Sequence, residues 1–205
     1  MHKKIIIFDL LGVITTESMF ATNIVYPMVK DKISYDLFKK KYLLYAMGVI
    51  GRKEFWEFIC APKEIMKFEK KIIQKTTLTP GVKKIMSDLL ASEYILCLAT
   101  EIPKEWGELL LKKAGIKHMF KRKFYSSDLR FTKPFAKFYK IVFGSIRNNE
   151  IFYIDDTLVN LVAAQKVKKH CAILYSPIND VKIPESLNYK IDNLIKIKEI
   201  CEIKK

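Results

Sequence analysis

Short runs of Ile, Val, Leu, Phe and Tyr recur along the chain, and each run ends at polar or turn-forming residues. Continuous apolar runs of this length are typical of strands that are buried on both faces. The predicted strands are Lys4–Leu11, Tyr94–Thr100, Lys123–Ser126, Ile151–Ile154 and Ala172–Tyr175. Apolar residues at three- and four-residue spacing predict helices over Gly81–Ala91, Trp106–Ala114, Pro134–Phe143 and Val159–Val167. Because strands and helices alternate, we expect the α/β class: a doubly wound, Rossmann-like parallel sheet with right-handed crossovers.

Residues between the first two predicted strands break this alternation. They contain helical patterns, such as Asp36–Met47 and Arg52–Ile59, and no convincing strand. Thr79-Pro80-Gly81 supplies a breaker at which the chain re-enters the core. We therefore predict a helical insert over residues 15–78, and an α/β core made of residues 1–14 and 79–205. The tail Asn193–Lys205 has the pattern of a terminal amphipathic helix.

The chain has 205 residues, of which 50% are hydrophobic and 29% are charged. This length allows one domain with a small insert, and this composition is typical of a packed core. The longest apolar runs are separated by Asp9 and are far shorter than the ~20 residues that span a bilayer. We expect no membrane segment. Because no small-residue cleavage site follows the first apolar run, we expect no signal peptide and a cytoplasmic location.

The chain has a formal net charge of +15. Such a charge attracts anions, which include phosphate esters, nucleic acid and acidic membrane surfaces. The lysines are scattered along the whole chain and form only short clusters, Lys39–Lys41, Lys121–Lys123 and Lys166–Lys169. This distribution favours a solvated basic surface over a nucleic-acid-binding patch. The charge alone does not choose among the anions.

Candidate chemistry lies where the predicted strands end. In an open α/β sheet, ligands bind outside the carboxyl ends of the strands. Asp9 ends the first strand, Thr100 ends the second, Lys133 opens a helix after the third, and Asp155-Asp156 end the fourth. Because parallel strands end at the same edge, these side chains are expected on one rim.

The pair Asp155-Asp156 indicates a cation site, because two adjacent carboxylates at a buried strand end repel each other without a positive partner. Mg²⁺, which takes oxygen ligands and keeps several waters, suits such a site. The alternative is a cap for the helix near Val159. Gly12 permits close approach of the backbone to a ligand. Lys133, which Pro134 holds extended at a first helical turn, can point its ammonium back to the rim.

Together these segments resemble the haloacid dehalogenase-like (HAD) hydrolases. The matching motifs, in chain order, are FDLLGVI (8–14), LAT (98–100), TKPFAKFY (132–139) and YIDDTLVNLVAAQ (153–165). The segment GVIGRKEFW (48–56) is similar to the helical-cap segment of a branch that includes sugar phosphatases. The resemblance covers nearly the whole chain, and its strength lies in the order and placement of the motifs.

The resemblance implies that Asp9 is the nucleophile, which forms an aspartyl-phosphate that water then hydrolyses. It implies a Mg²⁺ ion bound by Asp9, the main-chain carbonyl of Leu11 and Asp156, with Asp155 as a further ligand or a neighbour of the ligands. Thr100 and Lys133 would hold the phosphoryl oxygens, and we also place Gly12 and Glu101 on the substrate side.

This chain departs from the family pattern at two positions. Most phosphatases of the family have a second Asp two residues after the nucleophile, which protonates the leaving group, whereas this chain has Leu11. Leucine cannot transfer a proton, and general acid–base catalysis contributes ~10²–10⁴ in rate. Glu101 stands where the family has Asn, Gly or a small residue. This acid would repel a phosphate dianion unless it turns away or pairs with a lysine.

The leading functional prediction is an enzyme, a Mg²⁺-dependent phosphohydrolase for a small phosphorylated metabolite, with the insert as a cap that selects the substrate. A 2-haloacid dehalogenase, in which Asp9 attacks carbon without a metal, is compatible with Leu11. However, the paired acids Asp155-Asp156 would repel an anionic haloacid. A non-catalytic protein that binds a phosphorylated ligand is the third possibility, motivated by Leu11 and Glu101.

Overall fold

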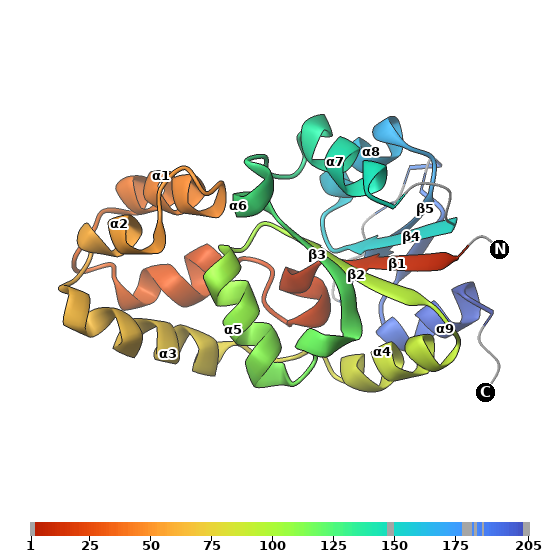
Figure 1. Ribbon diagram of the computed structural model, residues 1–205, viewed down its shortest axis with the longest axis horizontal. Helices are drawn as coiled ribbons and strands as arrows, with labels where there is room; N and C mark the ends of the chain where they lie inside the picture. The colour runs from red at the N-terminus through yellow and green to blue at the C-terminus, as the bar shows by residue number, and fades with distance from the viewer. Residues whose placement is uncertain (1–2, 147–149, 178–181, 183, 186, 203–205) are drawn as a thin grey trace.

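The computed structural model describes residues 3–146, 150–177, 182, 184–185 and 187–202. Within these residues a parallel six-stranded sheet has the order β3-β2-β1-β4-β5-β6 (Figure 1). The strands are β1 Lys4–Phe8, β2 Ile95–Thr100, β3 Phe120–Tyr125, β4 Glu150–Asp155, β5 Cys171–Tyr175 and β6 Tyr189–Ile191. The strand order reverses direction between β1 and β4, so this is the switch point of the sheet.

Helices cover both faces of the sheet. They are α4 Val82–Ala91, α5 Lys104–Ala114, α6 Ser126–Leu129, α7 Ala136–Gly144, α8 Leu158–Val167 and α9 Ile197–Ile200. Ile6 and Phe8 of β1 belong to the same buried cluster as Met86 of α4, whereas Ile7 clusters with Phe138 of α7. The side chains of β1 thus alternate between two buried layers, which explains its unbroken apolar sequence. The predicted doubly wound α/β fold is confirmed.

The segment between β1 and β2 forms helices α1 Tyr35–Ala46, α2 Arg52–Glu57 and α3 Ile65–Lys75, with short helical turns at Ala21–Val25, Tyr26–Met28 and Pro62–Glu64. We call residues 15–78 the insert; its helices lie at one end of the sheet (Figure 1). Thr15 and Leu78 form an antiparallel bridge where the chain leaves and re-enters the core. That the insert is a separate unit stays a prediction.

Several boundaries differ from the sequence-based expectations. β3 begins at Phe120 rather than Lys123, because its exposed basic residues hide the apolar pattern of an edge strand. β6 has three residues, too few for a recognisable pattern. The tail forms a 3-10 turn at Leu194–Lys196 and then the short α9, while residues 203–205 of the predicted tail helix lie outside the described residues. No described helix is both long and apolar enough to cross a membrane.

Trp106 of α5 joins the core to the insert. Its ring lies 5.4 to 6.2 Å from the rings of insert residues Phe20, Tyr42, Tyr45, Phe55 and Trp56. The buried carboxylate of Glu69, on α3, accepts hydrogen bonds from Trp106 Nε1 at 3.0 Å, Trp56 Nε1 at 3.1 Å and Arg52 Nε at 2.7 Å. Each bond is charge-assisted, so a single carboxylate ties α2, α3 and α5 together.

Replacing Glu69 with Gln is expected to lower the free energy of unfolding at pH 7 by about 2–3 kcal/mol, because these hydrogen bonds lose their charge. Burial raises the pKa of Glu69, but hydrogen bonds from Arg52 and the two tryptophans outweigh burial and lower this pKa. The stabilisation is therefore complete above the ordinary glutamate pKa of ~4.3 and is lost as the pH falls through the lower folded-state value. Urea unfolding of wild type and Glu69→Gln across this pH range measures the difference.

The matched control is Glu57→Gln, because Glu57 also lies in the insert but pairs with Lys53 on the helix surface, with 51% of its side chain exposed. Exposed pairs of this kind contribute at most about 0.5 kcal/mol. Equal effects of the two substitutions would show that the carboxylate does not join these helices.

Candidate active site

Asp9 and Asp155 meet at the switch point of the sheet. Phe8 is paired with Ile154, and the N–H of Asp9 donates to the carbonyl of Ile154 at 2.9 Å. The two acidic residues therefore follow paired positions on adjacent strands, at the carboxyl edge where α/β proteins bind ligands. Both side chains are buried.

A tight turn follows β1 and brings the main chain of Gly12 close to the acidic residues. The Asp9 carboxylate accepts the N–H of Leu10 at 2.7 Å, and Gly12 has a φ of 73°, which favours glycine. A Cβ at residue 12 would overlap the carboxylate of Asp156. Glycine is thus required twice, for the left-handed backbone and for the close approach of Asp156.

Lys133 links the two buried acids. Its Nζ lies 2.9 Å from Oδ2 of Asp9 and 2.8 Å from Oδ2 of Asp155, and its side chain is 1% exposed. Burial alone lowers the pKa of an ammonium, but Asp155 and Asp9 raise the pKa of Lys133 well above its usual value. Lys133 therefore carries its charge inside the protein. The expectation that Pro134 lies in the first helical turn is wrong, because Phe135 caps α7 and the helix begins at Ala136.

Asp155 has hydrogen-bond donors on both oxygens. Besides Lys133, Oδ2 accepts the hydroxyl of Tyr153 at 2.7 Å. Oδ1 accepts the N–H of Thr157 at 2.9 Å and the amide of Asn160 at 3.0 Å. These partners were not among the candidates from the sequence; the signal for Asn160 was its place in the first turn of the helix after the acidic pair. Three further donors thus orient the carboxylate that Lys133 contacts.

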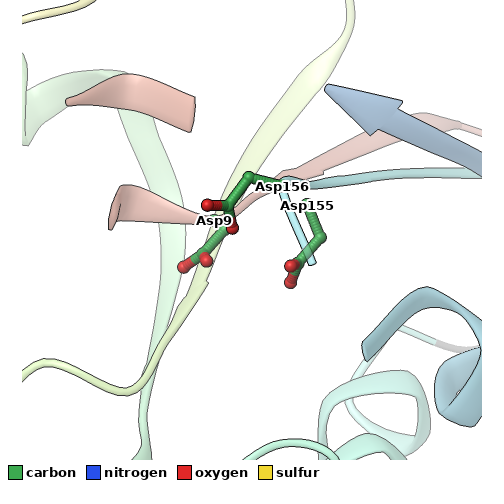
Figure 2. Close-up of side chains that lie close together, drawn as sticks. All are labelled: Asp9, Asp155 and Asp156. Atoms are coloured by element: carbon green, nitrogen blue, oxygen red, sulfur yellow. The ribbon is translucent and has the colours of Figure 1, made fainter. Parts of the chain in front are cut away.

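Three carboxylate side chains lie close together at the ends of β1 and β4 (Figure 2). Three carboxylate oxygens, one from each of Asp9, Asp155 and Asp156, lie within 4.8 Å of one another. Burial raises the pKa of Asp9 well above its ordinary value, and burial followed by the charge of Asp155 raises the pKa of Asp156 to about 6. Lys133 supplies a single positive charge to three acids. The donor set, oxygen-only and with an excess of negative charge, fits a hard divalent cation.

Thr100 and Glu101 enter the site from β2. Thr100, fully buried, ends the strand, and its hydroxyl accepts the N–H of Ile102 at 3.4 Å. The carboxylate of Glu101 accepts the main-chain N–H of Lys133. Burial raises the pKa of Glu101 to about 7, and the charge of Lys133 opposes that rise. The charge of Lys133 thus favours the ionised form of Glu101, although the ammonium itself pairs with Asp9 and Asp155.

The carboxyl edge of the sheet thus brings together the residues expected there. They are Asp9, Leu11, Gly12, Thr100, Glu101, Lys133, Asp155 and Asp156. The Leu11 side chain is partly buried and packs against the main hydrophobic core. Their catalytic, substrate-binding and metal-binding roles stay predictions. Tyr42 of α1 also faces Glu101, whose charge adds to the rise that burial causes in the tyrosine pKa.

This is an α/β protein whose doubly wound sheet carries an acidic cluster and a buried lysine at its switch point, the place where ligands bind in open α/β sheets. The family model for haloacid dehalogenase-like hydrolases matches residues 6–174, so the chain belongs to this family of hydrolases. The resemblance in the sequence motifs is confirmed at the level of the family. Its assignment to the helical-cap branch stays a prediction.

Solved structures share the fold of this chain. A HAD phosphatase from Thermococcus onnurineus is 20% identical, with a TM-score of 0.73 over 98% of this chain and 99% of that chain. A protein described as a HAD-hydrolase bound to magnesium, from Bacillus subtilis, is 18% identical, with a TM-score of 0.70 over 99% and 100%.

The L-2-haloacid dehalogenase from Xanthobacter autotrophicus is 10% identical, with a TM-score of 0.70 over 98% of both chains. Comparison with curated proteins finds no match. Because the structural neighbours include both phosphatases and dehalogenases, they support the shared fold and leave the choice of reaction to the site.

Proposed function

We propose that the protein is a Mg²⁺-dependent phosphohydrolase that acts on a small phosphorylated metabolite through an aspartyl-phosphate on Asp9. The observation that carries the proposal is that three carboxylates lie within 4.8 Å of one another, with Lys133 bonded to two of them. Phosphoryl transfer requires in-line positioning and neutralisation of charge, and this cluster can provide both.

In the first step a carboxylate oxygen of Asp9 attacks phosphorus, and the bond from phosphorus to the leaving oxygen breaks. In the second step water attacks the same phosphorus and releases Asp9 and inorganic phosphate. Lys133 lies 2.9 Å from Asp9, so its ammonium can offset the repulsion between this carboxylate and a phosphate dianion. Thr100 would hold a phosphoryl oxygen beside it.

Asp9, Asp156 and the main-chain carbonyl of Leu11 are the proposed ligands of Mg²⁺. When bound, the ion supplies charge neutralisation and orients the phosphoryl group. Asp155, whose oxygens already accept four hydrogen bonds, is proposed to position Lys133 instead of binding the ion. The magnesium described for the Bacillus subtilis neighbour supports this choice of metal.

The insert is proposed to act as the cap that selects the substrate. Its helix α1 brings Tyr42 toward Glu101 at the edge of the sheet. Trp106 and Glu69 hold the insert against α5. Side chains of the insert therefore lie beyond the carboxyl edge, where the non-phosphate part of a substrate would extend.

A panel of phosphate monoesters, assayed with Mg²⁺ and with EDTA, tests the function. We expect release of inorganic phosphate from at least one ester. The rate in EDTA should be at least about 100-fold lower than in Mg²⁺, and it should recover when Mg²⁺ is added back. Binding of the ester without any turnover would instead support the non-catalytic alternative. Turnover that continues unchanged in EDTA would contradict the assignment of the metal.

A dehalogenase remains the second candidate, because Leu11 removes the acid that phosphatases use and a dehalogenase shares the fold. The same protein preparation, given 2-chloropropionate in EDTA, distinguishes the two reactions. Chloride release with no phosphatase activity would replace the proposed function with dehalogenation.

A further inference from the structure

Glu101 and Leu11 follow the carboxyl ends of neighbouring strands. Leu98 of β2 is paired with Phe8 of β1; Glu101 directly follows the end of β2 at Thr100, and Leu11 lies in the turn that follows the end of β1 at Phe8. Neighbouring strands are ~4.8 Å apart. The glutamate that follows β2 therefore leaves the sheet at the same edge as the turn that contains Leu11.

Glu101 also lies on the same face of the sheet as the proposed nucleophile. Side chains alternate along a strand, and Ile7 and Ala99 share one buried cluster, so Asp9 and Glu101, each two residues further on, continue that face. The Glu101 carboxylate accepts the main-chain N–H of Lys133, whose Nζ contacts Asp9. Lys133 thus lies near both acids.

The surroundings allow Glu101 to exchange a proton near neutral pH. Lys133 favours its ionised form, whereas burial and the charges of Asp155 and Asp156 favour its neutral form. The charge of Glu101 also contributes to the raised pKa values of Tyr42, on the insert, and Tyr139, on α7. A group that titrates near the working pH is suited to give a proton in one step and take one in the next.

We propose that Glu101 donates the proton to the leaving-group oxygen, a role that Leu11 cannot fill. This inference rests on the proposed function. As the Asp9 oxygen bonds to phosphorus and the ester oxygen departs, the Glu101 carboxyl proton moves to that oxygen and an alcohol leaves. The resulting Glu101 carboxylate then takes a proton from the water that attacks the aspartyl-phosphate. Inorganic phosphate leaves, and both acids return to their starting forms.

Esters with different leaving groups test this role. The p-nitrophenolate anion leaves without protonation, whereas an alkoxide needs a proton. In Glu101→Gln we expect kcat/KM for the best alkyl phosphate of the panel to fall about 10²–10³-fold, and that for p-nitrophenyl phosphate to change less than about threefold. With the alkyl ester, the decline in rate above about pH 7 should be present in wild type and absent in the variant.

Glu105→Gln is the matched control, because Glu105 lies exposed four residues later in α5 and bonds to Tyr45 away from the acidic cluster. Its ratio of the two kcat/KM values should equal that of wild type. Circular dichroism and the Tm establish that each variant is folded, and Glu101→Asp, which keeps the acid, should recover part of the alkyl-ester rate.

Equal losses on both esters, or no loss on either, would overturn the proton-donor role and leave the proposed function intact. Wild-type turnover of p-nitrophenyl phosphate with no alkyl phosphate hydrolysed would likewise overturn it, because a proton donor makes alkoxides competent leaving groups. If wild type hydrolyses neither ester in an Asp9-dependent reaction, the proposed function fails and this inference fails with it.

Discussion

Asp9→Asn should abolish phosphate-ester hydrolysis, with kcat/KM at least about 10³-fold below wild type, because an amide oxygen cannot form the aspartyl-phosphate. The fold should survive. Burial raises the pKa of Asp9, so its ionised form is disfavoured in the folded protein, and the neutral amide keeps or increases the free energy of unfolding without added metal. Steady-state kinetics and urea unfolding measure the two effects separately.

Two controls belong to this experiment. Asp31→Asn, at an exposed position in the insert, should leave kcat/KM unchanged. Mg²⁺ should raise the Tm of wild type and raise that of Asp9→Asn much less, because a proposed ligand is missing. Undiminished hydrolysis by Asp9→Asn would refute the nucleophile and, with it, the proposed reaction.

Lys133→Met should affect stability and activity together. It removes the ammonium that lies within 2.9 Å of two buried carboxylates, and breaking such a pair from one side costs about 3–5 kcal/mol. The kcat/KM should fall at least about 100-fold because the phosphate then faces uncompensated acids. Since Asp155 and Asp9 raise the Lys133 pKa, the stabilisation is complete below ~pH 10 and lost as pH rises through the folded-state pKa.

Lys140→Met is the control for this variant, because Lys140 lies exposed on the neighbouring helix α7. It should change the free energy of unfolding by no more than about 0.5 kcal/mol. Combining Lys133→Met with Asp155→Asn should cost less than the sum of the single changes, because the second change removes a carboxylate that the first leaves unpaired. Additive effects would contradict the coupling of Lys133 to Asp155.

The sequence was most informative where one physical constraint acted on consecutive residues. Strands buried on both faces require unbroken apolar runs, so β1, β2, β4 and β5 could be located within a few residues. Where that constraint weakens, the pattern disappears: β3 carries exposed basic residues, and β6 has only three residues. The acids after Phe8 and Ile154 stood out because charge is costly at a buried strand end.

The order of apolar strands and the charged residues that end them were thus determined by the sequence alone. Which oxygen receives which donor was decided only by the tertiary structure. Tyr153, Thr157 and Asn160 surround Asp155 and turn it toward Lys133, while Asp156 turns toward Gly12.

The contact of Glu69 with Trp106, and that of Glu101 with the main chain of Lys133, likewise join segments more than thirty residues apart. The spacing of apolar residues indicates which face of a helix or strand is buried, because the preference of each side chain for burial depends on its own polarity. Hydrogen bonds depend on the distance and direction between two groups, and these arise only when the elements have packed.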